Sequence, residues 1–245
     1  MQARVVLGTG KVVMKVSGVI FDCDGTLLDS AGMWTKAQEE LARRAQVELG
    51  AAESAKISTL TIPEVGVFFH EHYGLAASSA AVVAMIDELM LDYYTAHAIA
   101  RPGALAFVQG LHERGIPCAV ASSSPQHFLQ AGLRHSGFMD CLDAIVSVDD
   151  VGASKREVAV YDRARDVMGA TTETSWGFED SLYAVHTLRA GGYRSVGVFD
   201  TDDAGTYEQL EATADFAIRS FEELNAAKFI LPEMSCQAFW GREKK

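Results

Sequence analysis

Carboxylates, hydroxyls and one ammonium group follow four separate apolar runs of this sequence. These side chains are, in chain order, Asp22 and Asp24, Ser122 to Ser124, Lys155, and Glu179 with Asp180. Mg²⁺ prefers oxygen ligands and is usually held by one or two carboxylates together with a substrate phosphate. Hydroxyl and ammonium groups in turn donate hydrogen bonds to phosphate oxygens. The residue types therefore predict a site for a hard cation and a phosphate group.

The positions of these groups depend on the elements that carry them. Short apolar runs predict buried strands at residues 16–21, 117–121, 144–148, 174–178 and 195–199, and helical patterns lie between them. Strands that alternate with helices predict a Rossmann-like, doubly wound α/β fold, in which helices cover both faces of a parallel sheet. Ligands of such sheets bind beyond the carboxyl ends of the strands, so the polar groups should face one crevice.

Residues 31–100 interrupt this alternation. Trp34, Ala37 and Leu41 recur at helical spacing, residues 82–93 repeat the pattern, and no strand-like run lies between them. We therefore expect an α-helical cap domain at residues 31–100, inserted into an α/β core. The core should consist of residues 14–30 and 101–225, with terminal extensions at residues 1–13 and 226–245.

The composition limits the classes of partner. The chain has 245 residues and a net charge of −12, which disfavours binding to nucleic acid or to an anionic membrane surface. No apolar run is long enough for a membrane span, the first 17 residues lack the pattern of a signal peptide, and the four cysteines form no C-x-x-C pair. We expect a cytoplasmic protein without nucleic-acid or membrane partners, present as a monomer or a weak homodimer.

Four sequence signatures together resemble those of the haloacid dehalogenase (HAD) superfamily. They are residues 21–30 (FDCDGTLLDS), residues 120–124 (VASSS), Lys155, and residues 178–181 (FEDS), in the order and spacing of the superfamily. The helical insert is similar to the C1 cap of the subgroup that contains β-phosphoglucomutase and many sugar-phosphate phosphatases. The resemblance covers residues 16–220 and implies a phosphohydrolase.

The resemblance also implies a role for each residue. Asp22 would attack phosphorus and form an aspartyl-phosphate, while Asp24 would act as general acid and then as general base. Mg²⁺ would be bound by the Asp22 and Asp180 carboxylates and the Asp24 carbonyl, with Glu179 as a further ligand or a supporting residue. The phosphate would be bound by the Ser122 hydroxyl, the Ser123 N–H group and the Lys155 ammonium group.

Two positions depart from the family or have a simpler interpretation. Family members usually follow the lysine with Pro-x-Pro-Asp, whereas Lys155 precedes residues 156–159 of sequence REVA. The position of Ser124 before Pro125 predicts a helix N-cap.

Several functions fit the superfamily, and the sequence favours one of them. Dehalogenases lack the second aspartate, and phosphonate hydrolases use a cap lysine that has no recognisable equivalent here. β-Phosphoglucomutases carry a histidine where Trp34 stands and an arginine near residues 59–61, which is absent. We therefore expect a Mg²⁺-dependent phosphatase of a small phosphorylated metabolite. A mutase-like phosphotransferase and a catalytically weak binding or regulatory protein remain as alternatives.

The cap should read the leaving group of the substrate. Residues 60–64 and Trp34 are the positions expected near it, and few of them are charged, which favours a sugar or polyol phosphate. Because substrate must enter a site that excludes water, we expect the insert to move as a unit. Its hinges should lie near residues 29–31 and 100–103.

Overall fold

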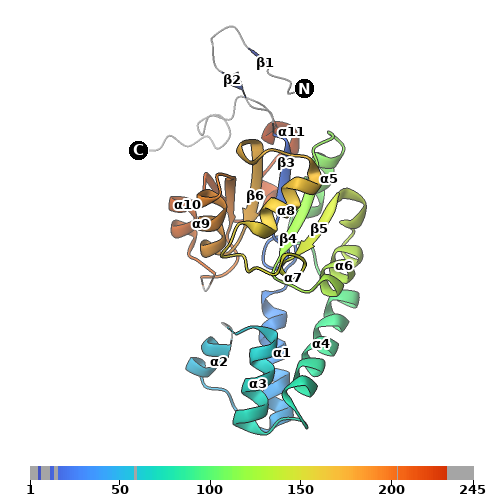
Figure 1. Ribbon diagram of the computed structural model, residues 1–245, viewed down its shortest axis with the longest axis vertical. Coiled ribbons are helices and arrows are strands. Elements are labelled where there is room, and N and C mark those ends of the chain that lie inside the picture. Colours follow the sequence, from blue (N-terminus) through green and yellow to red (C-terminus); the bar gives the residue numbers. More distant parts are fainter. Residues whose placement is uncertain (1–4, 7–11, 14–15, 58–59, 203, 231–245) are drawn as a thin grey trace.

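A parallel sheet forms the centre of the computed structural model, which describes residues 5–6, 12–13, 16–57, 60–202 and 204–230 (Figure 1). Its strand order is β5-β4-β3-β6-β7-β8. The strands are β3 (Gly18–Phe21), β4 (Cys118–Ser122), β5 (Ala144–Ser147), β6 (Ser175–Glu179), β7 (Arg194–Val198) and β8 (Phe216–Ile218). Outside this sheet, β1 (Val5–Val6) pairs antiparallel with β2 (Val12–Val13).

Helices cover both faces of the sheet because the central strands are apolar on both sides. Val19 and Phe21 of β3 belong to the apolar cluster on one face, and Ile20 belongs to the cluster on the other. The first face is covered by α5 (Ala104–His112), α6 (Gln126–His135) and α11 (Ala226–Phe229). The second is covered by α8 (Ala159–Met168) and α9 (Leu182–Ala190), with α10 (Tyr207–Thr213) beside α9. This arrangement is the predicted Rossmann-like α/β fold.

The insert between β3 and β4 contains four helices among its described residues. They are α1 (Ala31–Ala45), α2 (Ala51–Ile57), α3 (Ile62–Tyr73) and α4 (Ser79–Ala96). Figure 1 shows them beyond one end of the sheet, with α4 extending alongside α6. The rings of Tyr94 and Phe128 stack at this contact, with their centroids 5.1 Å apart. The last turns of α4 thus pack against the core.

The remaining helices are short. They are α7 (Val148–Val151) and the 3₁₀ segments at Met139–Cys141, Thr172–Thr174 and Phe221–Glu223. Within the described ranges, no helix has the combination of length and apolar composition that crossing a membrane requires. Cys23, Cys118 and Cys141 are free thiols, and Cys236 lies outside the described residues.

The structure extends the expected core in two places. The five predicted strands are present with ends shifted by at most two residues, but the edge strand β8 was not predicted. The core was also expected to end at residue 225, which is wrong for α11. Phe229 of that helix is buried, and its ring lies 5.5 Å from that of Phe107 and 5.7 Å from that of Phe178.

Candidate active site

The turn after β3 places Asp22 at the carboxyl edge of the sheet. The Asp22 N–H donates to the carbonyl of Phe178 on β6 at 2.9 Å, so this backbone is held in sheet register. Gly25 then turns the chain with a φ of +81°, a conformation that favours glycine. A Cβ atom at this position would lie only 2.7 Å from Oδ2 of Asp180. The turn therefore packs directly against the acidic group that follows β6.

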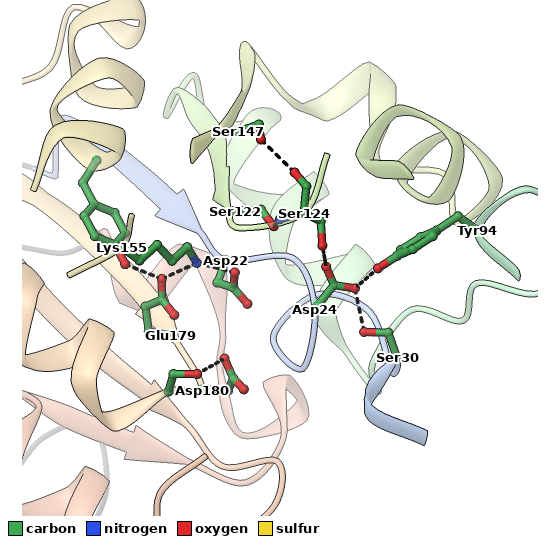
Figure 2. Close-up of polar contacts among 12 residues, drawn as sticks. Asp22, Asp24, Ser30, Tyr94, Ser122, Ser124, Ser147, Lys155, Glu179 and Asp180 are labelled. Atoms are coloured by element: carbon green, nitrogen blue, oxygen red, sulfur yellow. Dashed lines mark hydrogen bonds and ion pairs between the residues drawn. The ribbon is translucent and has the colours of Figure 1, made fainter. Parts of the chain in front are cut away.

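A buried acidic cluster forms where β3 and β6 end. Carboxylate oxygens of Asp22, Glu179 and Asp180 all lie within 4.8 Å of one another. The Nζ atom of Lys155 donates to Oδ1 of Asp22 and, at 2.7 Å, to Oε1 of Glu179 (Figure 2). The hydroxyl of Tyr161 on α8 also donates to Glu179 Oε1, at 2.7 Å. Despite the altered sequence after it, Lys155 thus reaches the cluster.

The charges of this cluster are not balanced by Lys155 alone. Burial raises the pKa of Asp22 and of Asp180, and it raises the pKa of Glu179 to about 7, although Lys155 lowers all three. Repulsion between the carboxylates adds to this effect. Oδ2 of Asp22 is buried and has no hydrogen-bond partner among the described residues. An oxygen donor set with an unpaired buried oxygen and excess negative charge fits Mg²⁺.

The Asp24 carboxylate points in another direction. Its Oδ1 accepts hydrogen bonds from the Ser30 hydroxyl at 2.7 Å and the Tyr94 hydroxyl at 2.5 Å. Its Oδ2 accepts from the Ser124 hydroxyl at 2.6 Å. In Figure 2 the side chain points toward Tyr94 and Ser30, away from Asp22. The acidic cluster therefore excludes the Asp24 side chain, and α4 of the insert supplies one of the three donors to it.

The serines after β4 divide into three different environments. Ser122 is buried, and its Oγ accepts from the Ser124 N–H at 3.0 Å, whereas Ser123 is exposed. The prediction that Ser124 caps the following helix is wrong. Pro125 occupies the N-cap of α6, and the Ser124 hydroxyl is bound to Asp24 instead. Because β4 pairs with β3 in parallel register, Ser122 and Ser123 lie at the same edge as Asp22.

Curated relatives with assigned activities match most of the chain. Validoxylamine A 7'-phosphate phosphatase of Streptomyces hygroscopicus subsp. limoneus is 25% identical over 212 residues, which are 84% of this chain and 94% of that protein. Hexitol phosphatase B of Escherichia coli (strain K12) is 25% identical over 215 residues, 86% of this chain and 96% of that protein. The chloroplastic protein SUPPRESSOR OF QUENCHING 1 of Arabidopsis thaliana is 30% identical over 199 residues, but this chain spans only 18% of its length.

Solved structures share the fold. The crystal structure of a putative β-phosphoglucomutase from Thermotoga maritima superimposes with a TM-score of 0.74 at 22% identity. The match covers 88% of this chain and all of the other. A family model described as haloacid dehalogenase-like hydrolase matches residues 16–192, which span the turn at Asp22, Lys155 and the acidic pair at the end of β6. The chain therefore belongs to the haloacid dehalogenase-like hydrolases.

Proposed function

We propose that this protein is a Mg²⁺-dependent phosphatase that transfers the phosphoryl group of a small sugar or polyol phosphate to Asp22 and then to water. The observation that supports it most directly is that the two carboxylate oxygens of Asp22 lie in different surroundings. Lys155 binds its Oδ1, while Oδ2 is buried beside Asp180 and has no hydrogen-bond partner in the described part of the chain. One oxygen is thus oriented, and the other is available to react or to bind a cation.

The residues that would hold the cation are those of the acidic cluster. Asp22 and Asp180 would supply carboxylate ligands and Asp24 its backbone carbonyl. Glu179 accepts hydrogen bonds from Lys155 and Tyr161, so its part is to orient the lysine or to provide a further ligand. Bound Mg²⁺ would shield the repulsion between Asp22 and the phosphate and stabilise charge on the phosphoryl oxygens.

The chain's own groups perform the remaining steps. Asp22 attacks phosphorus and the bond to the leaving oxygen breaks, while Asp24 protonates that oxygen. Asp24 then takes a proton from the water that hydrolyses the aspartyl-phosphate. For both steps its carboxylate must turn from Ser30 and Tyr94 toward the bound phosphate. The Ser122 hydroxyl, the Ser123 N–H group and Lys155 would bind the phosphoryl oxygens.

The surroundings of the leaving group favour a neutral sugar or polyol. Glu64 is the charged residue in the segment 60–64, and its carboxylate accepts from the Thr61 N–H at 2.7 Å in a helix capping box. The Glu64 carboxylate therefore caps α3 and is not expected to bind the substrate. Trp34 is half-buried against the core cluster. The relatives named as phosphatases of hexitol and of validoxylamine A 7'-phosphate support the same class of substrate.

The proposal is tested with p-nitrophenyl phosphate and then with a panel of phosphorylated sugars and polyols. We expect hydrolysis that requires Mg²⁺ and disappears after dialysis against EDTA, with a sugar or polyol phosphate as the best substrate. Ca²⁺ should inhibit, because it takes more ligands at longer distances. Full activity without a divalent cation would contradict the metal assignment. Preference for an anionic leaving group would contradict the substrate class.

A further inference from the structure

Arg101 contacts two separate segments at the point where the chain returns from the insert to the core. Its guanidinium group donates to the carbonyl of Gly25 at 2.9 Å, to the carbonyl of Phe199 at 2.8 Å, and to the Asp200 carboxylate. Its backbone N–H donates to the carbonyl of Leu27 at 2.8 Å. One residue therefore ties the loop after β7 to the turn that carries Asp24.

Asp200 brings a fourth carboxylate to the edge of the acidic cluster. Gly25 lies between it and Asp180: a Cβ on Gly25 would be 2.7 Å from Asp180 Oδ2 and 3.2 Å from Asp200 Oδ2. The side chains of Arg101 and Asp200 are each only 12% exposed. At such a site a carboxylate needs a counter-charge, and the Arg101 guanidinium group supplies it. Arginine suits this role, because its planar group carries several donors and stays charged.

We propose that Arg101 is a positioning residue that fixes the turn at Gly25 relative to Asp180, and so sets the geometry of the cation site and of Asp24. Gly25, whose carbonyl accepts from Arg101, directly follows Asp24 in the chain. The backbone carbonyl of Asp24 is an expected ligand of the cation. Arg101 also keeps Asp200 paired, so that Asp200 stays out of the cation site. The proposal rests on the proposed phosphatase function. It assigns Arg101 no contact with the substrate.

The test compares Arg101→Met, Arg101→Lys and a matched control, Arg165→Met. Arg165 is also partly buried and paired, with Asp162 at 2.6 Å and Thr172 at 2.7 Å, but it touches none of the site residues. Hydrolysis of p-nitrophenyl phosphate gives kcat, KM and the half-saturating Mg²⁺ concentration. Thermal denaturation with and without Mg²⁺ gives a second readout that does not depend on activity.

We expect Arg101→Met to lower kcat by about tenfold to a hundredfold and to weaken Mg²⁺ binding, with little change in KM for the phosphate ester. Arg101→Lys should recover part of the loss, because it restores the charge but not the fork of donors. The stabilisation by Mg²⁺ should be reduced in Arg101→Met and retained in Arg165→Met. The control should keep its kcat within about twofold.

A folded Arg101→Met protein with the kcat and Mg²⁺ response of the wild type would overturn the proposal, as would equal losses in Arg165→Met. If Arg101→Met does not fold, Asp200→Asn takes its place. We expect this variant to lower kcat measurably, but by less than about tenfold. An unchanged kcat together with an unchanged Mg²⁺ response would overturn the positioning role of Arg101. If the wild type hydrolyses no phosphate ester, the proposed function fails separately. The Mg²⁺-dependent thermal shift then still decides whether Arg101 shapes the cation site.

Discussion

The two oxygens of Asp22 lie in different surroundings, since Lys155 binds Oδ1 and Oδ2 has no hydrogen-bond partner among the described residues. Asp22→Asn keeps the shape of the side chain but removes the proposed nucleophile. We expect kcat for p-nitrophenyl phosphate with Mg²⁺ to fall by at least about a thousandfold. Circular dichroism should show an unchanged fold.

The matched control for this variant is Asp143→Asn. Asp143 is exposed at the start of β5, where it accepts from the Cys118 N–H at 2.9 Å, at the opposite end of the sheet. Its kcat should stay within about twofold of the wild type. An Asp22→Asn protein that kept about a tenth of the activity would contradict the covalent mechanism.

The acidic cluster also predicts how pH and Mg²⁺ act together on stability. Burial raises the pKa of Glu179 from 4.5 to about 7, so the folded, metal-free protein holds a proton there that the unfolded chain releases in this range. Stability of the metal-free protein should therefore fall as pH rises through the window between these two values. Mg²⁺ must displace such protons to bind, so its stabilising effect should grow over the same window.

The measurement is the thermal midpoint with and without Mg²⁺ at about pH 5 and about pH 8. A larger Mg²⁺-dependent increase is expected at the higher pH. Glu179→Gln has no carboxyl group to titrate and should flatten the dependence, while its amide oxygen can still accept from Lys155 and Tyr161. An equal Mg²⁺ effect at both pH values in the wild type would show that the cluster does not exchange protons for the cation.

At the scale of elements, the contact between α4 and α6 depends on a glycine. A Cβ on Gly132 would lie 2.7 Å from Cδ1 of Tyr94 and 3.0 Å from Cδ1 of Leu28, and both neighbours are fully buried. Gly132→Ala should therefore destabilise the protein by about 1–3 kcal/mol through overpacking, even though alanine favours helices. Chemical denaturation measures this difference.

The control for that variant is Gly32→Ala in α1. Apart from the backbone of its own helix and its chain neighbours, no atom of the described residues lies within 4 Å of a Cβ at Gly32, so the main change is in helix propensity. We expect between no change and about 1 kcal/mol of stabilisation. If Gly132→Ala behaved like Gly32→Ala, the packing of α4 on α6 would be looser than the contact with Tyr94 indicates.

Elements with long apolar runs could be predicted from the sequence, and short ones could not. β3, β4 and β6 are buried along their whole length, and β3 and β4 consist mainly of apolar residues. β8 has only three residues, pairs with a single neighbour and is half-buried, so its sequence carries little strand signal. The helix α11 buries Phe229 through tertiary packing that no local pattern reveals.

The same limit applies to the candidate site. Asp22, Glu179 and Asp180 could be brought together because each ends a predicted strand, and parallel strands end at one edge. Tyr94 and Tyr161 are not among the candidate site residues that the sequence predicts. Their rings are buried, but their hydroxyls bind Asp24 and Glu179. Only the three-dimensional packing shows that a buried aromatic residue also carries a donor to the site.

At the scale of the whole molecule, the insert is joined to the core by two crossings that are tied to each other. The Asp29 N–H donates to the carbonyl of Ile99 at 2.9 Å, and Arg101 binds the turn and the loop after β7. A bend at residues 101–103 would break these contacts. We therefore propose that the second hinge lies earlier than residue 100, close to residue 97, where α4 has ended.

Motion about these hinges must separate α4 from the core. The contacts to be released include the hydrogen bond from Tyr94 to Asp24 and the hydrogen bond between Asp87 and His127 at 2.7 Å. Release of Tyr94 would also remove one of the three donors that hold the Asp24 carboxylate, and so help it to turn toward a bound phosphate. Cap movement and the orientation of Asp24, the proposed general acid, should therefore occur together.

We expect Mg²⁺ with BeF₃⁻, a phosphate mimic, to favour a state in which the insert has rotated as a unit over the crevice. Small-angle scattering should then show a smaller radius of gyration than in the metal-free protein. Tyr94→Phe keeps the ring against Phe128 but removes the hydroxyl that binds Asp24, so the rotated state should need less of the mimic. Tyr93→Phe is the control, because it removes a different α4 hydroxyl, one that donates to the Asp29 carbonyl at 2.7 Å. It shows whether the effect of Tyr94→Phe comes from Asp24 or from a general loosening of α4. Identical scattering with and without the mimic would contradict the movement of the insert and leave the chemistry at Asp22 unaffected.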